Sequence, residues 1–101
     1  MSTLVPIQRV TIIADNVLTP MLLENLLKLG SNGYTYTDCQ GKGKHEELPD
    51  PFTGISRVRI EVFVQPDVAQ SIMEYLYSDE LRHYALIACV ETVEVASHEK
   101  F

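Results

Sequence analysis

Hydrophobic and polar residues follow strand-like patterns in four segments of the chain. Residues 8–14 are β-branched and apolar at successive positions, as in a central strand with both faces covered, and residues 34–40 are rich in aromatic and β-branched side chains. Residues 84–95 form an apolar run too continuous to leave one face in water. The fourth segment alternates, with one face formed by Val58, Ile60, Val62 and Val64 and the other by Arg57, Arg59, Glu61 and Phe63. The pattern therefore predicts four strands.

Two helices are predicted between these strands, because apolar side chains recur there with helical spacing. The first runs over residues 20–29, with Thr19 offering an N-cap oxygen. The second runs over residues 68–78, where Asp67 and Gln70 resemble a capping box. The order is strand, helix, strand, strand, helix, strand.

This order predicts an α+β fold of the ferredoxin-like βαββαβ type, with a four-stranded antiparallel sheet and both helices on one face. We expect residues 1–101 to form a single domain in which residues 97–101 are a C-terminal tail. Ile13 and alternate apolar positions of the last strand cannot all point toward two short helices. The uncovered face is therefore expected to pack against sister subunits.

Charge and composition narrow the class of protein. The formal net charge of −6 opposes binding to nucleic acid or to anionic lipid, and no apolar run approaches the length needed to span a bilayer, which favours a cytoplasmic protein. Cys39 and Cys89 are expected to be reduced structural thiols in the core. The three histidines, which are too scattered to indicate a metal site, are His45, His83 and His98.

The segment 41–55 differs from the rest, because it contains three glycines and two prolines and has little apolar periodicity. It begins with Gly41-Lys42-Gly43-Lys44, directly after a predicted strand. Glycines expose backbone N–H groups to an anion, and two ammonium groups can lie beside a phosphate. Arg57 and Arg59 share one strand face at the other end of the loop and can converge on the same anion. Alternatively, the glycines only start a flexible loop, the lysines are solvated and the arginines pair with Glu61.

Several motifs together resemble the PII-like signal-transduction proteins. These are Gly33-Tyr34-Thr35, then Gly41-Lys42-Gly43, a long loop and the strand at 58–64. With Tyr84-Ala85 before the last strand, the chain is most similar to the PII-like proteins linked to bicarbonate uptake and carboxysomes. The resemblance implies a non-enzymatic trimer that binds adenine nucleotide in three clefts between subunits. It also implies that the loop at 41–55, called the T-loop, engages a target such as a bicarbonate transporter or a carboxysome component.

The resemblance also implies site residues. The nucleotide-binding set is Thr37, Gly41, Lys42, Gly43, Lys44, Tyr84, Ala85 and Leu86, and the set for bicarbonate is Arg57 and Arg59. The chain departs from classical PII proteins because residues 41–55 contain no tyrosine and no Thr-Gly-x-x-Gly-Asp-Gly-Lys segment precedes the last strand. We therefore expect ADP or AMP, rather than ATP, as the ligand, with bicarbonate as a second one. Two alternatives remain open: a dimeric ferredoxin-like αβ-barrel enzyme, and a docking or assembly protein without a small ligand.

Overall fold

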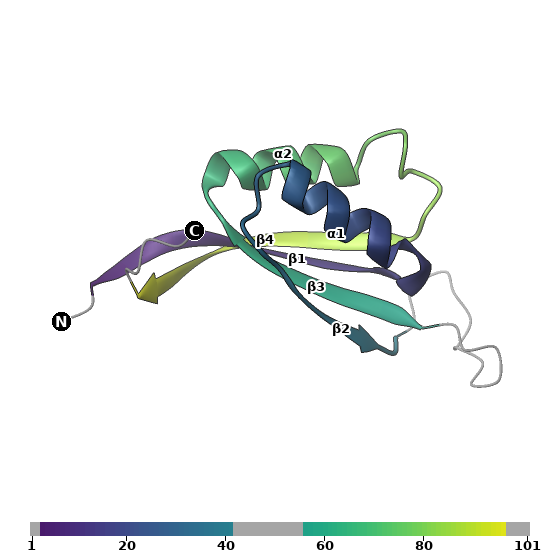
Figure 1. Cartoon of the computed structure of the whole chain (residues 1–101), viewed down its shortest axis with the longest axis horizontal. Helices are drawn as coiled ribbons and strands as arrows, with labels where there is room; N and C mark the ends of the chain where they lie inside the picture. The colour runs from purple at the N-terminus through teal and green to yellow at the C-terminus, as the bar shows by residue number, and fades with distance from the viewer. Residues whose placement is uncertain (1–2, 42–55, 97–101) are drawn as a thin grey trace.

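Four antiparallel strands form one sheet in the computed structural model, which describes residues 3–41 and 56–96 (Figure 1). The elements are β1 (Leu4–Asp15), the short 3-10 helix η1 (Asn16–Leu18), α1 (Thr19–Lys28), β2 (Thr35–Cys39), β3 (Arg57–Val64), α2 (Pro66–Leu76) and β4 (Leu86–Ala96). The strand order is β2-β3-β1-β4, and both helices cover the same face of the sheet (Figure 1). This confirms the predicted ferredoxin-like βαββαβ fold.

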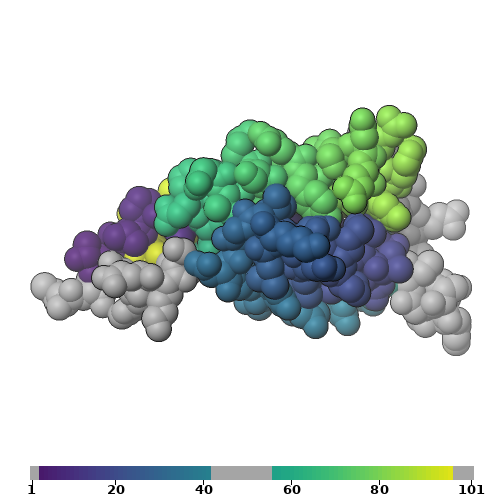
Figure 2. All heavy atoms as spheres, turned by 45° about the horizontal axis from the view of Figure 1, so that its top comes forward, coloured from purple at the N-terminus to yellow at the C-terminus, as the bar shows by residue number. Residues whose placement is uncertain are grey.

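The hydrophobic core lies between the sheet and the two helices, where burial of apolar side chains supplies most of the stabilisation. The alternation predicted for β3 is confirmed, because its four aliphatic residues have exposed fractions of 3% or less. The core side chains are Val10, Ile12 and Ala14 from β1, Leu18 from η1, Leu22 and Leu26 from α1, Val58, Ile60, Val62 and Val64 from β3, Ala69, Ile72 and Leu76 from α2, and Leu81 from the turn that follows α2. A view onto the packed helices is given in Figure 2.

The helix starts differ from those predicted. Thr19 is the first residue of α1 and not its N-cap, since its hydroxyl donates a hydrogen bond to the backbone oxygen of Asn16 at 2.7 Å. The capping function belongs to Asp15, whose carboxylate accepts a hydrogen bond from the backbone N–H of Val17 at 3.0 Å and so starts η1. The 3-10 turn thus moves the cap upstream of the predicted position.

The capping box predicted at the start of α2 is also wrong. The helix begins at Pro66, after an extended N-cap at Gln65 that makes no side-chain hydrogen bond. Proline suits the first helical position, and Asp67 lies in the first turn, where a negative charge is favourable. Gln70 donates instead to the Glu74 carboxylate at 3.0 Å, along the helix surface.

The sheet face opposite the helices, which we call the open face, is more polar than predicted. Ile13, Phe63 and Ile87 are exposed there, in agreement with the prediction of apolar residues on this face. However, the same face carries ion pairs, among them Arg9 with Glu91 at 2.8 Å and Arg59 with Glu61 at 2.9 Å. The open face is therefore a mosaic of apolar and ion-paired residues.

The two thiols are free, but they do not both lie in the core. Cys39 is half-buried at the end of β2, whereas Cys89 is exposed on the open face of β4. The prediction of a core position for Cys89 is wrong because Cys89 pairs with Thr11 on the open face, away from the helices, while its neighbour Ala88 faces them. In residues 3–41 and 56–96, neither helix has the length and hydropathy needed to cross a membrane.

Candidate functional site

The last residues of β1 and β2 and the first residue of β3 lie together where the chain enters and leaves the 41–55 segment. Cys39 at the end of β2 pairs with Arg57 at the start of β3, and Arg57 also pairs with Asp15 at the end of β1. Gly41 follows β2 and is exposed, and among residues 3–41 and 56–96, its chain neighbours aside, no heavy atom lies within 4 Å of the point that a Cβ atom would occupy there. This open approach to the backbone fits the predicted role of Gly41. Its predicted companions Lys42, Gly43 and Lys44 lie outside the described residues.

The start of β3 is held in place by η1. The backbone N–H of Asn16 donates to the Ser56 oxygen at 3.0 Å, and the Asn16 side-chain amide donates to the Ser56 hydroxyl at 2.6 Å. Because these bonds hold both the backbone and the side chain of Ser56, they fix the point at which the chain re-enters the sheet. The position of Arg57, the next residue, is thereby set.

The two predicted anion-binding arginines share the open face, as expected from the alternation of β3. Arg59 pairs across the sheet with Thr37 of β2, so the structure brings these two predicted site residues together. The Arg59 side chain is about half exposed, and its guanidinium is ion-paired with Glu61 at 2.9 Å. An anion at Arg59 must therefore compete with the Glu61 carboxylate.

Tyr84, Ala85 and Leu86 lie at the same end of the sheet but at its opposite edge. The predicted last strand begins at Leu86, which pairs with Ala14, while Tyr84 and Ala85 are exposed in the preceding turn. Since β3 and β1 lie between β2 and β4, the two edges are about 14 Å apart at the usual spacing of strands. The predicted nucleotide-binding residues thus fall into two groups that one chain does not bring together.

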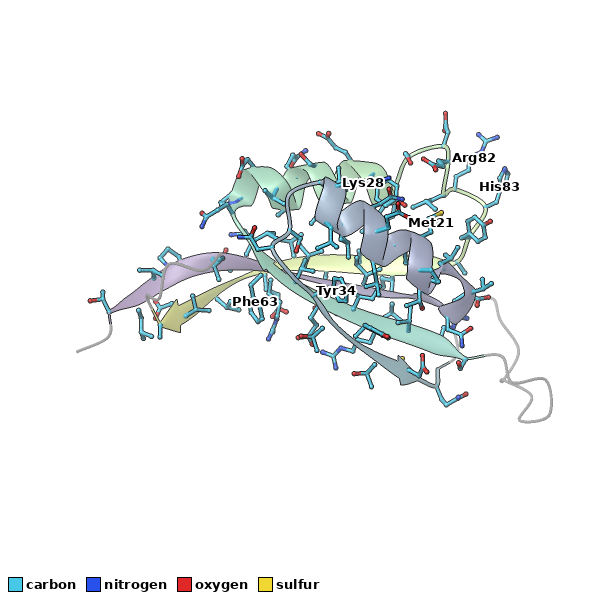
Figure 3. All side chains as sticks on the ribbon, in the orientation of Figure 1. Met21, Lys28, Tyr34, Phe63, Arg82 and His83 are labelled. Carbon is cyan, nitrogen blue, oxygen red and sulfur yellow. The ribbon has the colours of Figure 1, made fainter. Side chains whose placement is uncertain are left out.

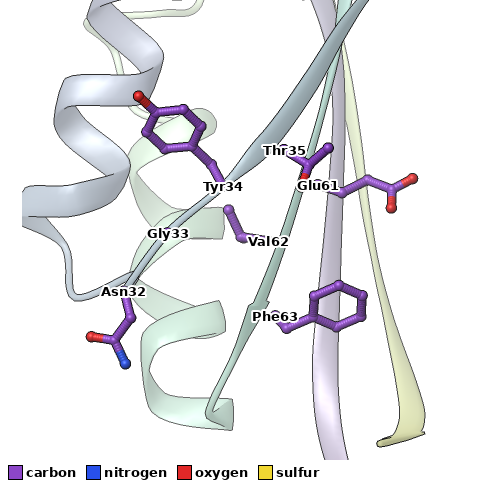
Figure 4. Close-up of a pocket in the computed structure, with 7 residues that line it drawn as sticks. All are labelled: Asn32, Gly33, Tyr34, Thr35, Glu61, Val62 and Phe63. Atoms are coloured by element: carbon purple, nitrogen blue, oxygen red, sulfur yellow. The ribbon is translucent and has the colours of Figure 1, made fainter. Parts of the chain in front are cut away.

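A hollow of about 190 Å³, which the sequence analysis did not identify, lies at the other end of β2 and β3 (Figure 4). It is lined by Asn32, Gly33, Tyr34, Thr35, Glu61, Val62 and Phe63. One wall of the hollow is formed by Gly33, Tyr34 and Thr35, a motif that the sequence analysis had noted for another reason. The other wall comes from β3 through the pairing of Thr35 with Glu61, which the separate patterns of the two strands do not reveal.

The hollow combines an aromatic ring with polar groups and a neighbouring cation. Phe63 is 36% exposed, and Thr35 and Glu61 place a hydroxyl and a carboxylate beside it (Figure 4). Arg9 pairs with Phe63 across β1 and β3, and its pKa is raised by the hydrogen bond and the charge of Glu91. Such a surface can stack against a planar ring and hydrogen-bond its edge. Among the described residues, no cluster of His, Cys, Asp and Glu could hold a metal ion.

Comparison with known proteins confirms the resemblance. Residues 7–100 match the family model of the nitrogen regulatory protein P-II. A candidate PII-like signalling protein of Thermus thermophilus is 38% identical, with 97% of each chain covered and a TM-score of 0.81. CPII of Thiomonas intermedia, solved with ADP and bicarbonate, is 20% identical, with 98% of this chain and 97% of that chain covered and a TM-score of 0.85. GlnK of B. subtilis is 17% identical, with coverages of 88% and 86% and a TM-score of 0.55. A search of curated protein sequences returned no match. The family match and the 38% identical relative show that this chain belongs to the P-II family.

Proposed function

We propose that this protein is a non-enzymatic sensor that binds ADP or AMP in clefts between the subunits of a homotrimer, with bicarbonate as a second ligand. The proposal rests above all on the family match over residues 7–100, because proteins of the P-II family are regulatory trimers that bind adenine nucleotides. CPII has been solved with ADP, AMP and bicarbonate bound. The signal would pass through the segment 41–55 to a target such as a bicarbonate transporter or a carboxysome component.

The positions of the candidate surfaces favour a site shared between subunits. Thr35 in the hollow and Gly41 at the loop base are six residues apart along an extended segment, or about 20 Å. Tyr84 lies at the opposite edge of the sheet. An adenine nucleotide cannot reach from the hollow to the loop base of the same chain. A neighbouring copy that brings its loop base to this hollow would complete the site.

In this arrangement, the hollow takes the adenine and the loop base takes the phosphates. The ring of Phe63 offers a stacking surface, while the Thr35 hydroxyl and nearby backbone groups can read the edge of the base. At the loop base, Gly41 leaves its backbone open to a phosphate, and Lys42 and Lys44 follow directly. Tyr84, Ala85 and Leu86 remain the predicted contacts from the β4 edge.

The pairing of two arginines on the described open face supports ADP or AMP over ATP. Arg9 and Arg59 are each engaged with a glutamate in the described structure. Each further phosphate charge placed in a partly desolvated cleft without a matching cation costs free energy. A diphosphate or monophosphate therefore fits the available charge better than a triphosphate.

Calorimetric titration with AMP, ADP and ATP, together with light scattering, tests this function. We expect one nucleotide per subunit of a trimer, with ATP the weakest of the three. A dimer with turnover of a substrate would favour the αβ-barrel enzyme. A stable assembly that binds none of the three nucleotides would favour the docking protein.

A further inference from the structure

The short helix η1 binds the first residue after the 41–55 segment through a side chain as well as through the backbone. The β1–β3 ladder ends at the pairing of Asp15 with Arg57, and Asn16 and Ser56 lie one step beyond it. The Asn16 N–H donates to the Ser56 oxygen at 3.0 Å, and the Asn16 side-chain amide adds a bond of 2.6 Å to the Ser56 hydroxyl. Ser56 is thereby held at two atoms directly before Arg57.

Asn16 is itself held in place, because the residues on both sides of it are fixed. Its backbone oxygen accepts a hydrogen bond from the Thr19 hydroxyl at 2.7 Å. On the other side, the Asp15 carboxylate accepts one from the Val17 N–H at 3.0 Å. Leu18, which is 5% exposed, anchors the same turn in the core. Asn16 therefore presents its side-chain amide from a fixed backbone position.

The position of Ser56 affects both sides of the loop base. Arg57 follows Ser56 in the sequence and pairs with Cys39 across β3 and β2, and Gly41 comes two residues after Cys39. A shift of Ser56 would therefore move Arg57 directly and Gly41 through the strand pairing. Gly41 is a predicted contact of the nucleotide, and Arg57 is a predicted contact of bicarbonate.

The sheet does not depend on the bond between the two side chains. The register of β1 and β3 is already set by a ladder that runs from the pairing of Gln8 with Val64 to that of Asp15 with Arg57. One further hydrogen bond adds little to a register that a whole ladder defines. Its effect is local, since it fixes the orientation of Ser56 where the ladder has already ended.

We propose that Asn16 and Ser56 are positioning residues for the loop base, so that its affinity for an oxyanion depends on the bond between their side chains. The oxyanion is a phosphate of ADP or free bicarbonate, and in this respect the inference rests on the proposed function. Binding groups that are ordered in advance lose less conformational entropy when the ligand arrives. Loss of the bond leaves the fold intact but lets Arg57 and Gly41 move out of the binding geometry.

Calorimetric titrations of the full chain with ADP and with bicarbonate, at fixed pH and ionic strength, test the inference. Asn16→Ala and Ser56→Ala both keep the backbone bond, and each should weaken binding about 3- to 10-fold, the effect of losing one hydrogen bond. The double variant should lose no more affinity than either single variant, since both substitutions remove the same bond. Ser56→Thr, which keeps the hydroxyl and suits a strand, should restore the affinity.

Asn25→Ala is the matched control. The Asn25 amide donates to the Tyr75 hydroxyl at 2.8 Å, which is also a part-buried bond between two side chains. Asn25 lies on α1 between Met21 and Lys28, the two residues of this helix that Figure 3 labels. This variant should lower the midpoint of urea unfolding as Ser56→Ala does, but it should leave the affinity for both ligands unchanged.

NMR of the ligand-free chain gives a second measurement that does not depend on binding. Ser56→Ala should speed amide hydrogen exchange at Asn16 and shift the amide signals of Arg57 and Gly41. Ser56→Thr should reverse these changes, and Asn25→Ala should not produce them.

The outcomes separate this inference from the proposed function. If the unaltered chain binds ADP and all three alanine variants bind it equally well, the bond is only structural, the inference is wrong and the sensor function stands. If the unaltered chain binds neither ligand, the sensor function fails and NMR decides the inference: shifts at Arg57 and Gly41 that Ser56→Thr reverses support it, and their absence overturns it. Equal losses of affinity in Asn25→Ala and Ser56→Ala would reflect lower stability alone and would also overturn it.

Discussion

Replacing Phe63 with alanine tests whether the hollow receives the adenine ring. The exposed 36% of a side chain that offers about 200 Å² leaves about 70 Å² for a ligand to cover. At about 25 cal/mol per Å², this area is worth about 2 kcal/mol of binding free energy, or a loss of roughly 20-fold in affinity. Because AMP and ADP carry the same base, Phe63→Ala should weaken both by the same factor in calorimetric titrations.

The remaining two thirds of Phe63 is buried within the chain, so the substitution also lowers the free energy of unfolding, by about 3 kcal/mol on the same scale. Circular dichroism and light scattering must therefore show that the variant is folded and still assembled. Thr35→Ala, at an exposed position in the same hollow, offers a milder second variant. Leu27→Ala is the matched control, since Leu27 is 48% exposed on α1, on the helix side of the sheet. Unchanged nucleotide affinity in a folded, assembled Phe63→Ala protein would refute the assignment of the base to the hollow.

Three other predictions concern the loop base, the assembly and the core. Lys42→Ala and Lys44→Ala should each weaken ADP binding by roughly 1 to 3 kcal/mol, as expected for losing a charge-assisted hydrogen bond, and calorimetry that finds no change in either variant would exclude the loop-base assignment. Light scattering should report a homotrimer, whereas a stable monomer or dimer would remove the shared cleft. Leu22→Ala, at a fully buried core position, should lower the free energy of unfolding by about 2 to 5 kcal/mol in urea titrations, and a loss below about 1 kcal/mol would contradict the described core.

The fold was predictable because the local patterns agree with the global arrangement. The alternation from Arg57 to Val64 fixed the buried face of β3, and the helical stripes fixed both helices within two residues. Helix starts were less predictable, since Asp15 and Asn16 create a 3-10 turn that displaces the cap from Thr19. A one-turn change of this kind depends on side-chain hydrogen bonds that have no periodic signature.

The candidate site could be predicted only for residues that are neighbours in the sequence. The place of Gly41 directly after a strand could be predicted, but the hollow joins Thr35 to Phe63 through strand register, which no single segment encodes. The exposed position of Cys89 was missed for a similar reason, because which face of a strand the helices cover depends on how the whole sheet is assembled. The apolar run at 84–95 indicates a strand but not which of its faces the helices cover.

The most direct test of the sensor function is a calorimetric titration of ADP with and without saturating bicarbonate, at fixed pH and with chloride keeping the ionic strength equal. If both ligands order the same loop base, their binding is coupled by about 1 to 3 kcal/mol. We predict that ADP binds once per subunit and that bicarbonate raises its affinity roughly 5- to 150-fold, with ADP raising bicarbonate affinity by the same factor. Absence of ADP binding under both conditions would contradict the nucleotide-sensor function, and an equal rise in affinity with chloride alone would contradict the role of bicarbonate.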